Sequence, residues 1–89
     1  MAHSLSAQKR IRQNEKARAR NRWRKRTLKE SLKAMEEALA HGSQVDAEKA
    51  FRAACRTLDR TAQKGVIHRN TAARKKSRLN AALRAKMKS

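Results

Sequence analysis

The chain has few residues that interrupt a helix, because it contains no proline and only two glycines, Gly42 and Gly65. Proline breaks helices, and glycine is favoured just after a helix C-terminus. The two glycines therefore divide the 89 residues into three segments that can each form one uninterrupted helix. A chain of this length is typical of a single domain with a modest core. We predict an all-α three-helix bundle, with helices over about residues 7–41, 44–64 and 68–87.

Apolar residues recur in each segment at the three- and four-residue spacing of a helix face. These faces comprise Leu28, Leu32, Met35 and Leu39 in the first segment, Ala47, Phe51, Ala54, Leu58 and Ala62 in the second, and Ala72, Leu79, Leu83 and, more loosely, Met87 in the third. Short connections make neighbouring helices antiparallel. The first apolar face ends at Leu28, so the preceding half of that helix has no core to pack on. We predict one domain in which a basic helical extension over residues 1–27 projects from a bundle over residues 28–89.

Residues that cap helices stand at the expected boundaries. The candidate N-caps are Ser4 or Ser6 for the first helix, Ser43 with Asp46 in capping-box spacing for the second, and Asn70 for the third. Gly42 and Gly65 are predicted to be the C′ residues after the first and second helices. Val66 and Ile67 are expected to pack back against the last turn of the second helix.

The charge is concentrated at the two ends of the chain. Residues 1–31 carry 11 Lys or Arg and 2 Asp or Glu, residues 32–63 carry 5 of each kind, and residues 64–89 carry 9 cations and no acid, which gives the net charge of +18. Like charges at this density repel one another and oppose compaction. The composition therefore predicts a polyanionic partner, of which nucleic acid is the commonest.

Positive charges surround the predicted first helix instead of occupying one face. Arg18, Arg20 and Arg22 follow one another at about 200° around the helix axis. A helix that lies on a membrane surface keeps one face apolar, which this segment does not. No apolar run approaches the length that spans a bilayer, so no membrane partner is expected. The arrangement favours a helix with phosphates on several sides, as among packed RNA helices.

Two stretches, SAQKRIRQNEKARARNR at 6–22 and KGVIHRNTAARKKSRL at 64–79, resemble the bacterial small-subunit ribosomal protein family S-twenty. Their order and spacing match that family over essentially the whole chain, and the second stretch is the more specific. The resemblance implies a three-helix bundle that binds 16S ribosomal RNA directly in its 5′ domain, with the first helix between RNA helices. It also implies a cytoplasmic, non-enzymatic role in assembly of the small subunit. The charge pattern by itself indicates only a helical protein that binds a polyanion.

The residues expected to contact rRNA are cations and amides on the first helix and around the start of the third. Arginine can fork two hydrogen bonds to one phosphate, and amides can bond 2′-hydroxyls or base edges. The candidates are Lys9, Arg10, Arg12, Gln13, Asn14, Lys16, Arg18, Arg20, Asn21, Arg22, Arg24, Lys25, Arg26, Lys64, His68, Arg69, Asn70, Arg74, Lys75, Lys76 and Arg78. Lys76 lies near the apolar edge of its helix and is expected to extend outward. For the amides, plain solvated positions remain an equal alternative.

Trp23, His68 and Cys55 are each considered for an individual role. Trp23 has two interpretations, stacking on a base or ribose or padding the edge of the bundle, and stacking is slightly favoured. His68 is expected to make a hydrogen bond at the corner between helices or to a phosphate. His3 and His41 offer it no useful metal-binding spacing, so neither a metal nor another cofactor is predicted. Cys55, the only cysteine, is interpreted as a small core residue.

The main alternative function is that of a histone-like protein that compacts DNA. Charge on all sides of the first helix favours packed RNA, and the chain lacks a proline wedge of the kind used to kink DNA. The expected partners are 16S rRNA and other components of the small subunit, without homo-oligomerisation. We also expect residues 1 to about 25 to be largely disordered in the free protein and to become helical on RNA.

Overall fold

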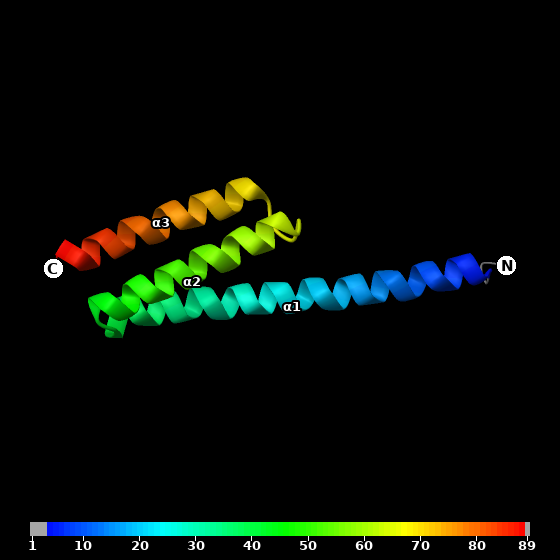
Figure 1. Cartoon of the computed structure of the whole chain (residues 1–89), viewed down its shortest axis with the longest axis horizontal. Helices are drawn as coiled ribbons and strands as arrows, with labels where there is room; N and C mark the ends of the chain where they lie inside the picture. The colour runs from blue at the N-terminus through cyan, green and yellow to red at the C-terminus, as the bar shows by residue number, and fades with distance from the viewer. Residues whose placement is uncertain (1–3, 89) are drawn as a thin grey trace.

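Three helices form the fold of residues 4–88, the part of the chain that the computed structural model describes. Helix α1 spans Leu5–His41, α2 spans Gln44–Gln63 and α3 spans Arg69–Lys88. Figure 1 shows α2 between the C-terminal half of α1 and α3, while the N-terminal half of α1 extends alone beyond the bundle. The molecule is 66 Å long but only 22 by 14 Å across. The predicted all-α bundle with a projecting first helix is confirmed.

Helix α1 begins two residues earlier than predicted because Ser4 caps it. The Ser4 hydroxyl accepts a hydrogen bond from the backbone N–H of Ala7 at 3.2 Å. The helix ends at His41 as predicted, but Gly42 is its C-cap in an extended conformation (φ −86°) and not a left-handed C′ residue. Glycine is favoured there by space, since an added Cβ would lie 2.9 Å from the carbonyl oxygen of Ala38.

The C-terminus of α2 is closed by a Schellman motif, in which Gly65 is the C′ residue as predicted. The backbone N–H of Gly65 donates to Ala62 O at 3.0 Å, and that of Val66 donates to Thr61 O at 3.1 Å. Gly65 has φ +75°, a left-handed conformation that glycine adopts without a steric penalty. The turn brings Ile67 back against the core.

The N-termini of α2 and α3 are capped in different ways. At α2 the predicted capping box forms, with Asp46 N–H donating to Ser43 Oγ at 3.1 Å and Ser43 N–H donating to Asp46 Oδ2 at 3.4 Å. At α3 the prediction that Asn70 is the N-cap is wrong. The first helical hydrogen bond runs from Ala72 N–H to His68 O, and His68 Nδ1 accepts from Asn70 N–H at 3.1 Å. His68 therefore takes the capping position directly before the first helical residue, Arg69, because its ring nitrogen can accept from the N–H of the second helical residue, Asn70.

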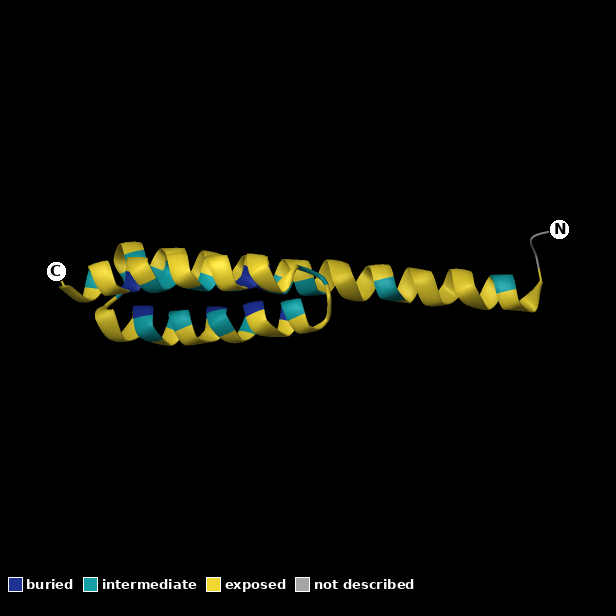
Figure 2. Ribbon diagram, turned by 90° about the horizontal axis from the view of Figure 1, so that it is seen from above, coloured by how far each residue is buried: buried dark blue, intermediate teal, exposed yellow. Residues whose placement is uncertain are grey.

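The core consists of two small clusters in which all three helices take part. One contains Leu28, Leu58 and Ala72, and the other contains Met35, Ala47, Ala54 and Leu83. Figure 2 shows that the buried positions lie only where the helices run side by side. Met35 and Leu58 are the largest side chains that are fully buried. Met87 is 39% exposed and belongs to neither cluster, in keeping with its loose place on the apolar face.

No described residue before Leu28 is buried, so residues 5–27 of α1 form a basic extension without a core. The structure describes these residues in helical form. The expected transition from coil to helix on RNA binding stays a prediction, and its part on residues 1–3 lies outside the described residues.

Candidate nucleic-acid interface

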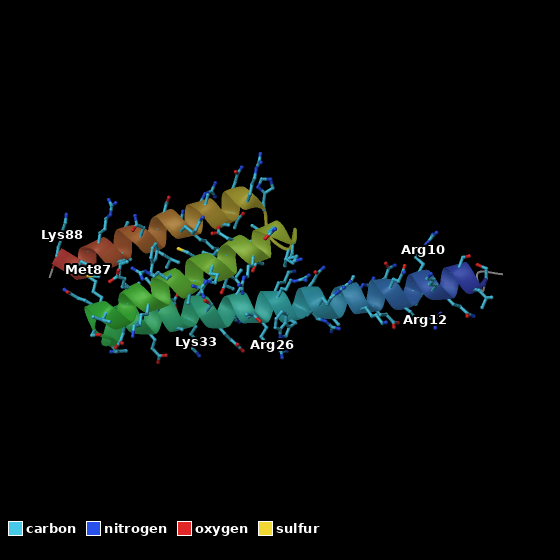
Figure 3. The ribbon with its side chains drawn as sticks, viewed as in Figure 1. Arg10, Arg12, Arg26, Lys33, Met87 and Lys88 are labelled. Atoms are coloured by element: carbon cyan, nitrogen blue, oxygen red, sulfur yellow. The ribbon has the colours of Figure 1, made fainter. Side chains whose placement is uncertain are left out.

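The basic extension carries ten cations and one carboxylate, Glu15. Nine of the ten cationic side chains are exposed, and Arg24 is half-buried. The two ion pairs of residues 4–88 both lie in the bundle, so no described carboxylate pairs with any cation of the extension. Figure 3 shows Arg10 and Arg12 on opposite sides of α1. The extension therefore presents uncompensated positive charge around its whole circumference.

One face of the extension also holds a shallow depression of about 490 Å³. It is lined by Glu15, Arg18, Asn21, Arg22 and Lys25. Three- and four-residue spacing brings these side chains together on the helix surface. The predicted amides Gln13 and Asn14 are exposed as well. None of the predicted residues of the extension is withdrawn into a core.

The second predicted group begins at the turn between α2 and α3. This turn lies at the end of the bundle from which the extension emerges, so the two predicted groups flank the same end (Figure 1). Lys64, Arg69, Asn70, Arg74, Lys75 and Arg78 are exposed. The cations of α3 then run back along the bundle, away from the extension. The two groups of predicted residues therefore lie close to each other at the turn, and they point in opposite directions along the molecule beyond it.

Lys76 differs from the other predicted cations because the protein supplies its counter-charge. Its Nζ lies 2.7 Å from Asp59 Oδ1 across the α2–α3 interface, instead of extending outward as expected. The hydrogen bond that Lys76 donates to Asp59 raises the pKa of Lys76 above its ordinary value of 10.5. Burial raises the pKa of the neighbouring Cys55 thiol above 9.0, opposed by the positive charge of Lys76. A thiol that stays protonated is a poor nucleophile. Cys55 is half-buried and belongs to neither core cluster, so it lies at the edge of the core and not within it.

His68 makes the predicted hydrogen bond at the corner between helices. Because Nδ1 accepts a hydrogen bond from Asn70 N–H, the ring proton of the neutral imidazole belongs on Nε2. His68 is exposed, so Nε2–H can donate to a phosphate oxygen. Within residues 4–88 no group of three His, Cys, Asp or Glu side chains could hold a metal ion. His3 lies outside the described residues.

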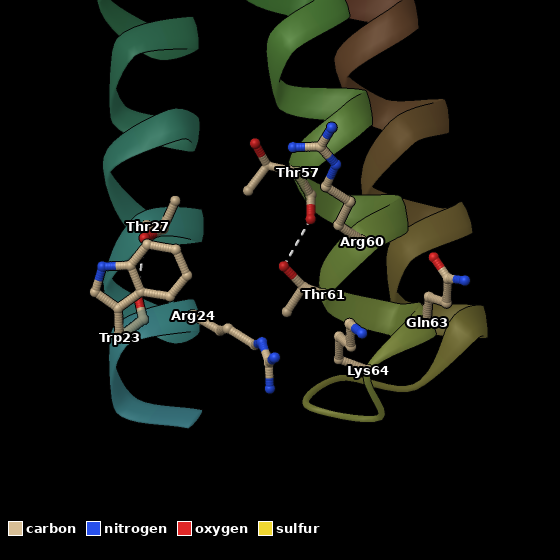
Figure 4. Close-up of a pocket in the computed structure, with 8 residues that line it drawn as sticks. All are labelled: Trp23, Arg24, Thr27, Thr57, Arg60, Thr61, Gln63 and Lys64. Atoms are coloured by element: carbon tan, nitrogen blue, oxygen red, sulfur yellow. Dashed lines mark hydrogen bonds between the residues drawn. The ribbon is translucent and has the colours of Figure 1, made fainter. Parts of the chain in front are cut away.

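A groove of about 400 Å³ separates α1 from α2 where the extension leaves the bundle. It is lined by Trp23, Arg24, Thr27, Thr57, Arg60, Thr61, Gln63 and Lys64. Figure 4 shows Arg24 reaching from α1 toward α2, with Lys64 on the opposite wall. Three lining residues are cations and none is a carboxylate. The groove joins the extension to the basic turn and makes one continuous basic surface.

Sequence reasoning missed Arg60 and Thr57 as candidate contacts. Both lie in residues 32–63, whose net charge is zero, whereas the charge count indicated contacts only in the two terminal segments of the chain. One signal was available: Arg60 stands four residues before Lys64, the C-cap of α2, so the two lie on the same side of the end of that helix. Nothing in the sequence placed that face opposite Trp23.

Comparison with known proteins identifies the family. A family model described as "Ribosomal protein S20" matches residues 2–84. The chain belongs to this family. The members of this family are structural components of the ribosome, so the chain is not an enzyme. The resemblance noted in the sequence is confirmed.

Individual relatives are similar over nearly their whole length. The small ribosomal subunit protein bS20 of Syntrophobacter fumaroxidans is 48% identical over 80 residues, which cover 90% of this chain and 93% of the relative. The bS20 protein of Teredinibacter turnerae is 48% identical over 84 residues, covering 94% and 96%. Among the described residues, no helix has both the length and the apolar character needed to span a membrane. Family membership supports a structural role in the small ribosomal subunit together with its rRNA.

Proposed function

We propose that this chain binds 16S rRNA directly and that the basic extension of α1 is its principal contact. The proposal rests on one observation. The extension carries ten cations, none of which packs in a core or forms a described ion pair. Cations crowded in this way repel one another. Phosphates would remove that repulsion, and the release of condensed counterions would drive binding.

The arrangement suggests how the two parts of the chain would cooperate. A helical extension of 23 residues is about 35 Å long, enough to lie between neighbouring RNA helices. Charge on every side would neutralise phosphates of several RNA helices at once, which would favour their close packing during assembly. The bundle over residues 28–89 would fix the direction of the extension over residues 1–27, and both would belong to one domain. The predicted contact residues keep this role in the proposal, with Lys76 the weakest candidate because Asp59 already pairs with it.

The resemblance to the family directs the proposal to the 5′ domain of 16S rRNA, in the ribosome of the bacterial cytoplasm. The decisive experiment measures binding of the full chain to a folded 5′-domain fragment and to duplex DNA of similar charge, over a salt series. We expect a strong preference for the RNA at moderate salt. Equal affinity for both would overturn the ribosomal proposal in favour of a DNA-compacting protein. Sedimentation of the RNA complex should show one copy of the chain, since no homo-oligomer is expected.

A further inference from the structure

We propose that the groove between α1 and α2 binds a single unstacked RNA nucleotide, with its base on Trp23 and its phosphate on Arg60 and Lys64. This inference rests on the proposed rRNA binding and deepens it, because it adds a site that reads one nucleotide to a surface that contacts phosphates. The groove is one of several basic surfaces, but it alone among those described combines an exposed aromatic ring with cations on both of its walls.

The indole of Trp23 is the first reason for the inference. Trp23 is 64% exposed and belongs to neither core cluster, although it is the largest apolar side chain of the protein. The other aromatic residue, Phe51, packs against the core. An exposed flat ring at the wall of a groove is suited to stack on a nucleobase, as in proteins that bind unpaired nucleotides. The edge-padding interpretation requires burial that the ring does not have.

The charges of the groove are the second reason. Arg24, Arg60 and Lys64 all line the groove, and none has an ion pair within the described residues. Figure 4 shows Arg24 reaching from α1 toward α2, with Arg60 and Lys64 on the α2 side. Asp59, the residue before Arg60, is held by Lys76 of α3 and does not line the groove. A phosphate would supply the missing counter-charge, and the arginine can fork two bonds to it.

The threonine hydroxyls are the third reason, because they present acceptors. Thr27 Oγ1 donates to Trp23 O at 2.9 Å, Thr57 Oγ1 donates to Ala53 O at 3.0 Å, and Thr61 Oγ1 bonds in the same way to Thr57 O. Each hydroxyl proton is thus committed to the helix backbone, which leaves oxygen lone pairs on the groove side. Thr27 and Thr57 can accept from a base N–H or a ribose 2′-hydroxyl. A nucleotide has both kinds of group, acceptors on its phosphate and donors on its base and sugar.

The size of the groove agrees with one nucleotide. A volume of about 400 Å³ falls near the lower end of the range of roughly 300–1,000 Å³ usual for small-molecule sites. The site also continues directly into predicted contacts, since Arg24 belongs to the extension and Lys64 to the basic turn. A nucleotide of an RNA held by these surfaces would reach the groove without a separate binding event.

The test uses the full chain and the 16S 5′-domain fragment. Trp23 is the only tryptophan, so its fluorescence reports on the groove alone. We expect quenching on RNA binding and a weakening of affinity of about 5- to 150-fold for Trp23→Ala, the range for loss of one base–aromatic stack. Trp23→Ala should leave the salt dependence unchanged, because a stack releases no counterions. Trp23→Phe, which keeps an aromatic face, should recover most of the affinity.

The cations are tested with a matched pair of double variants. Arg60→Gln with Lys64→Gln should reduce the slope of log K against log salt by about 1.4 to 1.8, the effect of two lost phosphate charges. The control, Lys49→Gln with Arg56→Gln, removes two exposed charges from α2 outside the groove and should change the slope by less than half as much. Circular dichroism of each variant verifies that the bundle is intact.

The outcomes separate this inference from the proposed function. If the wild-type chain does not prefer the RNA fragment, rRNA binding fails and the inference fails with it. If the wild-type chain binds the RNA but Trp23 fluorescence is unchanged, only the nucleotide site is overturned. Equal effects of the groove variant and its control on the salt slope would likewise reject the groove as a special site.

Discussion

The basic extension and the bundle share one continuous helix, α1, yet they differ in almost every other respect. In the bundle, α1 contributes Leu28 and Met35 to a core that all three helices build. In the extension, no described residue is buried, and there are ten cations but only one carboxylate. The bundle pairs part of its charge internally, through Arg52 with Glu48 and Lys76 with Asp59. The difference therefore lies in what the side chains meet and not in the secondary structure.

This contrast shows that the extension obtains little stability from the protein itself. Helices without tertiary packing are marginal in water. Like charges four residues apart, such as Arg18 and Arg22, destabilise a helix further. The bundle, in contrast, is held by the burial of apolar side chains and pairs two of its cations with carboxylates of its own. The bundle is therefore the main source of stability, and the extension is the part that depends most on a polyanionic partner.

The largest expected effect comes from removing charge on the extension. Replacing Arg18, Arg22 and Lys25 by glutamine should weaken binding to the 5′-domain RNA on the order of 1,000-fold, at about 1.5 kcal/mol for each lost charged hydrogen bond. The slope of log K against log salt should fall by about 2 to 3. Filter binding over a salt series measures both quantities.

The matched control for this variant takes three cations from outside the predicted contacts. Replacing Lys29, Lys33 and Lys49 by glutamine removes the same formal charge from exposed positions of the bundle. It should weaken RNA binding by less than about 10-fold, since it acts only through the general field. Equal losses from the two triple variants would abolish the distinction between the binding part and the folding part.

The next effect is on stability and falls on the bundle. Leu58 is fully buried between α1 and α3, so Leu58→Ala should lower the free energy of unfolding by about 2–5 kcal/mol. Ile11 is 54% exposed on the extension, and Ile11→Ala should change the free energy of unfolding by less than about 0.5 kcal/mol. Urea unfolding followed by circular dichroism compares the two. A similar cost for both substitutions would mean that the extension has a core after all.

A smaller effect concerns the helix content of the free extension. If residues up to about 25 uncoil without RNA, the ellipticity of the free chain should be roughly a quarter below that of the fully helical form. Saturating RNA should restore it, after subtraction of the nucleic-acid signal. A shortened chain that begins at residue 26 should show no such gain. Full helicity of the free chain at low concentration would contradict the expected transition.

The fold could be predicted from the sequence because its signals are local. The two glycines, the Ser43 and Asp46 capping box, and the apolar spacing each act over a few residues. The errors arose where local rules compete. Asn70 is the better capping residue by type, but the helix begins one residue before it, and the His68 ring supplies the acceptor that the Asn70 N–H needs.

The candidate site was less predictable because it depends on packing between helices. Charge counting identified the extension and the basic turn, whose residues act through exposure alone. It could not foresee that Asp59 would neutralise Lys76, since that contact joins α2 to α3. Nor could it bring Arg60 opposite Trp23, because the register of α1 against α2 is set by the buried residues between them.

The smallest expected effect is a dependence of bundle stability on pH that the extension lacks. Asp59 raises the pKa of Lys76, so the folded chain holds a proton that the unfolded chain loses near pH 10.5. This stabilisation is fully present below pH 10.5 and is lost as the pH rises through the raised pKa. In a Cys55→Ala background, which removes the nearby thiol, the gap in unfolding free energy between the parent and Asp59→Asn should be constant from about pH 6 to 9 and should close above about pH 10.5. Arg20→Gln, which removes an extension cation with no described carboxylate partner, should open no gap that varies with pH over this range. A gap for Asp59→Asn that stays constant to pH 12 would show that the charge of Lys76 contributes nothing to it, and the α2–α3 interface would then resemble the extension in gaining no stability from an ion pair.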